Sequence, residues 1–163
     1  MMNSAQANNR WVIGFCLVFS LILAVFPLSM ELRWFRPEFI ALLVIYWVTT
    51  LPEHFGVGFA WCAGILLDIV QGSVIGEHAL ALVVVAYVCQ LSYQRIRNYG
   101  VWKQACWVFV LVGIHQLFCN WVHSLSGYTA SPRVFLLPAF VSALLWPLVM
   151  IFFERLRLNF RIS

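Results

Sequence analysis

Six long apolar stretches, separated by short polar breaks, make up almost the whole of this 163-residue chain. A helix needs ~20 residues to cross ~30 Å of hydrocarbon. The first stretch, Trp11 to Met30, runs for 20 residues without a charge. Hydrophobic residues are 63% of the chain and charged residues only 10%, whereas an ordinary soluble domain has ~25% charged residues. The sequence therefore predicts an integral membrane protein with almost nothing outside the bilayer.

The stretches predict an all-α protein, with about six transmembrane helices in one bundle and one domain, 1–163. Helices are expected because the apolar runs are continuous rather than alternating, and because each backbone amide must be bonded within the lipid. The expected segments are 11–30, 39–51, 55–70, 79–93, 104–122 and 134–153, followed by a cytoplasmic tail at 154–163. The second segment is short for a span, so we consider both a thinned crossing and half of a re-entrant hairpin.

The distribution of basic residues predicts how the bundle is oriented. If the six segments alternate in direction, one side of the membrane carries Arg10, Arg95, Arg97, Lys103, Arg155, Arg157 and Arg161. The other side carries Arg33, Arg36 and Arg133. Lysine and arginine are enriched in cytoplasmic loops, so both termini are expected in the cytoplasm. Cytoplasmic contacts are then expected at Arg95, Arg97, Lys103, Arg155, Arg157 and Arg161. The excess positive charge faces anionic membrane lipid there and needs no nucleic-acid partner.

The third segment carries a ribbon of small side chains with one acid, repeating every four residues. Its members are Gly56, Ala60, Gly64, Asp68, Gly72 and Gly76. Small residues at this spacing let another helix approach closely within lipid. Two alternatives remain open, because the neighbour is either another helix of this protein or the helix of a partner. Gly72 and Gly76 are expected in the external turn, where glycine serves backbone geometry.

Asp68 is the only acidic residue inside an apolar run, which makes it a functional candidate by default. The structural alternative is an ion pair or a helix cap, with Arg36 as the preferred partner. A polar stripe on the fifth segment extends this candidate to an external polar cluster of Arg36, Asp68, His115, Gln116, Asn120 and His123. This cluster is either an outward-facing cavity for a ligand or a partner's polar residue, or a set of interhelical hydrogen bonds worth ~0.6 kcal/mol each.

The sequence contains little evidence for a catalytic or metal-binding site. It contains no Gly-x-Ser-x-Gly, no His-Glu-x-x-His and no Gly-Lys-Ser/Thr phosphate loop. His115 and His123 are eight residues apart and would need a further convergent ligand to hold a metal. The cysteines lie within apolar runs without close pairs and are interpreted as small hydrophobes. We therefore expect a protein without enzymatic activity, cofactor or metal.

A series of short motifs resembles the MreD family of rod shape-determining proteins of Gram-negative bacteria. The densest block is Gly64-Ile-Leu-Leu-Asp68-Ile-Val-Gln-Gly72-Ser73-x-x-Gly76. The others, in order, are Arg36-Pro37-Glu38-Phe39, Tyr46-Trp47, Leu51-Pro52, Tyr93-Gln94-x-x-Arg97-Asn98, Trp102-x-Gln104 and Leu145-Trp146-Pro147. Their order and spacing extend the resemblance over nearly the whole chain.

The resemblance implies a non-enzymatic scaffold in the inner membrane, acting in the elongation machinery that makes peptidoglycan and is required for rod shape. The implied partners are MreC, as the direct one, the MreB filament, the glycosyltransferase RodA and its class B penicillin-binding transpeptidase. In that role the ribbon and neighbouring helices would hold the single transmembrane helix of MreC. The family is also similar to the six-helix substrate-binding subunits of energy-coupling-factor vitamin transporters. The alternative function is therefore a small-solute binding subunit of a transporter.

Overall fold

The computed structural model describes residues 10–127, 136–160 and 162. Within these residues it contains six α-helices, one short 3-10 helix and no strand, which confirms the predicted all-α class. The elements are α1 (Arg10–Val25), η1 (Leu32–Phe35), α2 (Phe39–Thr50), α3 (Val57–Gln71), α4 (Glu77–Arg97), α5 (Val101–Leu125) and α6 (Leu137–Asn159). Three of them, α4, α5 and α6, are long and apolar enough to cross a membrane.

The helix ends differ from the ends of the apolar stretches. Helix α1 stops at Val25, five residues before the expected end at Met30, because Pro27 disfavours helical geometry at the residue before it. Helix α6 continues to Asn159, so most of the expected tail is helical. Polar residues can continue the backbone hydrogen bonding of a helix beyond its apolar run, so the length of the apolar run underestimates the length of the helix. Arg133 and Arg161, which were used to predict orientation, lie outside the described residues.

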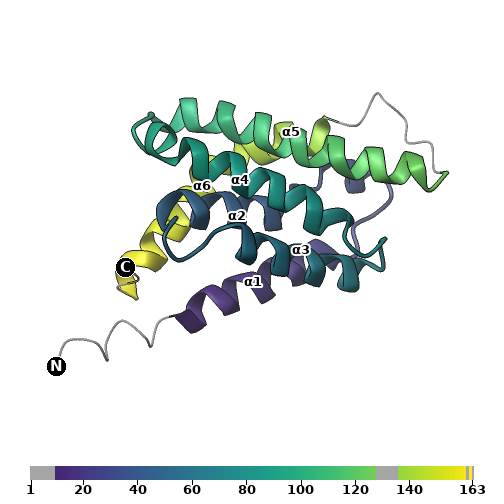
Figure 1. Cartoon of the computed structure of the whole chain (residues 1–163), viewed down its shortest axis with the longest axis horizontal. Coiled ribbons are helices and arrows are strands. Elements are labelled where there is room, and N and C mark those ends of the chain that lie inside the picture. The colour runs from purple at the N-terminus through teal and green to yellow at the C-terminus, as the bar shows by residue number, and fades with distance from the viewer. Residues whose placement is uncertain (1–9, 128–135, 161, 163) are drawn as a thin grey trace.

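Helix α2 is the core of the bundle. It packs against each of the other five helices, and Figure 1 shows it in the middle of the molecule. Its side chains from Ile40 to Thr49 are all buried, as expected for a helix that is apolar on every face. Twelve residues rise only about 18 Å, which is short of the hydrocarbon thickness. The second segment is therefore short because it is a buried core helix, enclosed by longer neighbours.

The helices place the polar turns at two opposite ends of the bundle. Figure 1 shows the start of α1, the α2–α3 turn, the α4–α5 turn and the end of α6 at one end, and the α3–α4 turn at the other. The first of these, here called the basic end, carries Arg95, Arg97, Lys103, Arg155 and Arg157. Arg97 and Arg157 there line a cavity of about 280 Å³ together with Glu154. The opposite end carries most of the buried acidic and histidine side chains.

Candidate functional site: a buried polar cluster opposite the basic end

The small-residue ribbon of α3 packs against α4 within the protein. Ala60 and Gly64 are buried. A Cβ atom added to Gly64 would lie 2.6 Å from the backbone nitrogen of Ala79 on α4, closer than real Cβ contacts. A Cβ atom added to Gly56 would lie 2.5 Å from the Gln90 side-chain nitrogen. At Gly56 and Gly64 the neighbour of the ribbon is therefore the protein's own helix α4. The grip on MreC through this face stays a prediction, which these contacts do not favour.

Gly72 and Gly76 lie in the turn between α3 and α4, as the sequence predicts. Gly72 ends α3 with φ 65° and Gly76 precedes α4 with φ 99°. Backbone in this left-handed region strongly favours glycine, because a side chain there is strained. The two residues reverse the chain within a few positions. This reversal brings the first amide groups of α4 back toward the end of α3.

Asp68 receives those amide groups and acts as a cap for α4. Its fully buried carboxylate accepts hydrogen bonds from the backbone nitrogens of Gly76, at 2.8 Å, and His78, at 3.0 Å. It also accepts a bond from the Ser73 hydroxyl at 2.9 Å and lies 2.8 Å from Nδ1 of His78. A negative charge at a helix N-terminus is favoured by the unpaired amides and by the helix dipole. The carboxylate thereby ties two helices and their turn together.

The expected pairing of Asp68 with Arg36 is wrong. The guanidinium group of Arg36 donates a hydrogen bond to the backbone carbonyl of Leu23, at 2.7 Å. His78 takes the place predicted for Arg36, because the α3–α4 turn brings it directly beside the carboxylate. In the sequence, His78 lies in the polar break between the third and fourth apolar stretches.

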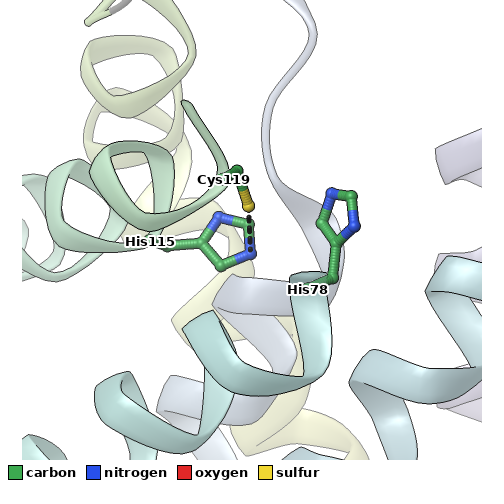
Figure 2. A group of neighbouring side chains, drawn as sticks. All are labelled: His78, His115 and Cys119. Atoms are coloured by element: carbon green, nitrogen blue, oxygen red, sulfur yellow. Dashed lines mark hydrogen bonds between the residues drawn. The ribbon is translucent and has the colours of Figure 1, made fainter. Parts of the chain in front are cut away.

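His115 on α5 lies in a second layer next to His78. Its side chain is buried, and its ring centroid lies 5.6 Å from that of His78. Nε2 of His115 lies 3.9 Å from the sulfur of Cys119, one turn further along the helix. Figure 2 shows His78, His115 and Cys119 gathered between α4 and α5. Nδ1 of His115 is buried and has no hydrogen-bond partner in the described part of the chain.

Two further carboxylates complete the polar region. Glu77 is buried, and its Oε1 lies 3.1 Å from Nδ1 of His123, while its Oε2 is buried without a partner among the described residues. Glu38, just before α2, accepts a hydrogen bond from the Gln116 side chain at 2.7 Å. Burial raises the pKa of the Glu38 carboxyl, although the charges of His78 and Arg36 and the bond from Gln116 act in the opposite direction.

These groups form what we call the buried polar cluster: Glu38, Asp68, Glu77, His78, His115, Gln116 and Cys119, with His123 at its exposed edge. The sequence predicted Asp68, His115, Gln116 and His123 but missed Glu38, Glu77 and His78. The missed residues lie directly at helix starts. In the sequence they belong to polar breaks between apolar stretches, so the pattern does not mark them as part of a buried cluster. Asn120 is half-buried one turn beyond Gln116, and its backbone carbonyl accepts a bond from Ser124.

The predicted outward-facing cavity does not reach Asp68 or His115. Asp68 is 0% exposed and His115 is 1% exposed, so neither lines an open space. Asp68 is instead bonded to Ser73, Gly76 and His78, and His115 lies against His78 and Cys119, so both take part in contacts within the helix bundle.

A second candidate surface is an apolar groove between α1 and α6. Its volume is about 720 Å³, and its lining is almost entirely apolar, including Phe15, Phe19, Leu148 and Phe152. Phe15 is 72% exposed and Phe152 is 53% exposed, so the groove is open along its length. Within the described residues, α1 packs against α2 and α3, and no Cα atom of α1 lies within 8 Å of a Cα atom of α6. The groove thus offers two helix faces without a helix between them.

Comparison with known proteins gives a consistent result. Residues 5–156 match the family described as rod shape-determining protein MreD. The rod shape-determining protein MreD of Haemophilus influenzae is 32% identical over 144 residues, which cover 88% of this chain and 87% of that protein. No solved structure matches the chain. The similarity to energy-coupling-factor transporter subunits stays a prediction.

Proposed function

The chain belongs to the MreD family of rod shape-determining proteins, and from this premise we propose that it is a non-enzymatic scaffold of the cell-wall elongation machinery. In this proposal MreC is the direct partner, and MreB, RodA and the class B penicillin-binding transpeptidase are members of the same complex. Family membership supports a part in determining rod shape. The scaffold role and the named partners go beyond family membership and are our proposal.

The groove between α1 and α6 is the observation that carries the proposed MreC contact. Lipid tails are as apolar as leucine, so helices in a membrane associate through close packing rather than through the hydrophobic effect. A groove with walls on two sides lets an inserted helix form more van der Waals contacts than a flat surface does. The single transmembrane helix of MreC is the occupant that we propose. We do not propose the ribbon on α3 as the MreC contact, because α4 already packs against it.

The orientation of the bundle is part of the proposal. The basic end carries Arg95, Arg97, Lys103, Arg155 and Arg157, and an excess of basic residues marks the cytoplasmic side. We place this end in the cytoplasm, facing anionic lipid and the MreB filament. The buried polar cluster then lies toward the outer face of the inner membrane, where MreC exposes its exported domain.

A cysteine-labelling experiment tests this orientation. In a variant without its native cysteines, a single cysteine replaces either Asn98 or Ser126. Both positions are exposed, in the α4–α5 turn and after α5 respectively. An impermeant maleimide is expected to label the Ser126 position in intact spheroplasts and the Asn98 position only after the membrane is opened. Labelling of the Asn98 position in intact cells would overturn the orientation.

Alanine substitution in the groove tests the proposed MreC contact. The Phe152→Ala and Phe15→Ala variants are expected to accumulate normally, because both side chains are largely exposed, yet to recover several-fold less MreC on purification. Such variants should restore rod shape poorly in a strain that lacks the native protein. The physical reason is the loss of aromatic packing area from the groove wall.

Phe140→Ala is the matched control for this experiment. Phe140 is a similarly exposed phenylalanine on the same helix, at 59% against 53% for Phe152, and it does not line the groove. Its substitution is expected to leave MreC recovery unchanged. A photocrosslinker placed at the Phe152 position should form an adduct with MreC, and one at the Phe140 position should not. Adducts with lipid alone at the Phe152 position would show that the groove is a lipid site.

A further inference from the structure

We propose that His78, His115 and Cys119 bind a single Zn²⁺ ion between α4 and α5. This site is independent of the proposed MreC contact, since its residues and those of the groove are different. No metal site was expected from the sequence, because the histidine pair on the fifth segment is His115 and His123. The fold instead brings in His78 from another helix.

The geometry of the three side chains suits a tetrahedral cation. One potential ligand atom from each residue lies within 4.8 Å of the other two, and the distance between Nε2 of His115 and the Cys119 sulfur is 3.9 Å. Zinc binds nitrogen at ~2.0 Å and sulfur at ~2.3 Å, which puts the ligand atoms of a tetrahedral site roughly 3.3–3.5 Å apart. Side-chain movements of about 1 Å would close the site around an ion. Figure 2 shows the three side chains near one another, His78 on α4 and His115 and Cys119 on α5.

The surroundings of His78 are those of a metal ligand. Its Nδ1 lies 2.8 Å from the Asp68 carboxylate, which leaves Nε2 as the ring nitrogen for coordination. Histidine ligands of metals almost always donate their second ring N–H to a carboxylate or carbonyl, which fixes the tautomer and the ring orientation. Asp68 is itself held by two backbone amides and a hydroxyl. The His78 ring is thus fixed before an ion arrives.

The charge around the site favours a cation. The Asp68 carboxylate lies 2.8 Å from Nδ1 of His78, and Glu77, which is buried, directly precedes His78 on α4. Burying negative charge is costly unless it is compensated. A bound divalent cation would compensate it, because such an ion is often the largest local charge in a site. Glu77 also keeps a buried carboxylate oxygen without a partner in the described chain. A thiolate with two imidazoles selects Zn²⁺ among the abundant divalent ions.

Access to the site is narrow but present. The side chain of His78 is 11% exposed, and Cys119 is half-buried. The two side chains are therefore not fully sealed inside the protein. The three protein ligands leave a fourth position for a water molecule.

Metal titration of the purified, untagged protein in detergent tests the proposal. After chelator treatment and its removal, the protein is expected to take up one Zn²⁺ per chain, as measured by mass spectrometry of the metal content. Co²⁺ in place of Zn²⁺ should give a thiolate-to-cobalt charge-transfer absorption band. Zn²⁺ should also raise the Tm of the protein, because binding to the folded state alone stabilises it.

The Cys119→Ala variant separates this site from adventitious binding. It should lose the bound ion, the cobalt band and the Tm shift, while circular dichroism shows that the helices remain. Cys106→Ala is the matched control, because Cys106 is an exposed cysteine on the same helix, and it should retain all three. His78→Gln tests the second ligand and should also lose the bound ion. Equal Zn²⁺ uptake by the wild type and Cys119→Ala, or the absence of the thiolate band, would overturn the proposal.

Discussion

Replacing Gly64 with leucine is expected to remove the protein from the membrane rather than only from its complex. Even a methyl group at this position would collide with the backbone of α4 at Ala79. Backbone atoms cannot move aside as the end of a flexible side chain can, so α3 and α4 would have to separate. Overpacking typically costs about 1–3 kcal/mol for added methylenes, and a whole leucine side chain here exceeds that range. Immunoblotting of membranes and the Tm of the purified variant measure the effect.

Gly58→Leu is the matched control for this experiment. Gly58 lies on the same helix but is exposed, and a Cβ atom there meets nothing within 4 Å. The control protein is expected at nearly normal abundance. Normal abundance of Gly64→Leu together with loss of MreC would contradict the internal packing and would return the ribbon to the role of a partner interface.

Replacing Asp68 with alanine is expected to destabilise the fold about as strongly as Gly64→Leu does. The substitution leaves two backbone amides, a hydroxyl and the His78 ring without the acceptor that holds them. Removing one partner of a buried charged pair typically costs about 3–5 kcal/mol. We expect a large fall in Tm and in the amount of folded protein. Glu53→Ala, at an exposed glutamate in the α2–α3 turn, should have little effect.

A double-mutant cycle distinguishes the two possible partners of Asp68. The milder variants Asp68→Asn and His78→Gln keep the protein measurable, and the unfolding free energies of the singles and the double give the coupling. Residues in direct contact typically couple by about 0.5–3 kcal/mol. A cycle of Asp68→Asn with Arg36→Gln should instead be additive within roughly 0.5 kcal/mol. Additivity with His78, or coupling with Arg36, would contradict the hydrogen bonding that the structure shows.

The amino-acid sequence by itself determined the class of this protein and its helices. Continuous apolar runs in lipid leave the backbone little choice but helices, because no water is available to bond its amides. Short polar breaks with glycine or proline then separate the runs, as at Gly72 to Gly76 and at Leu51-Pro52. The ordered motifs from Arg36 to Pro147 also indicated the family, which the comparisons confirm.

Only the tertiary structure decided which face of each helix meets which neighbour. In a membrane, apolar side chains face lipid and protein core alike, so hydropathy did not distinguish the wholly buried α2 from the exposed face of α1. The ribbon on α3 has the same spacing whether its neighbour is α4 or another protein, and only the structure places Gly64 against Ala79 of α4. Likewise, the α3–α4 turn places His78, and not Arg36, in hydrogen-bonding distance of Asp68. These partners depend on the rotation and spacing of packed helices, which set which side chains meet across the lipid-embedded interfaces.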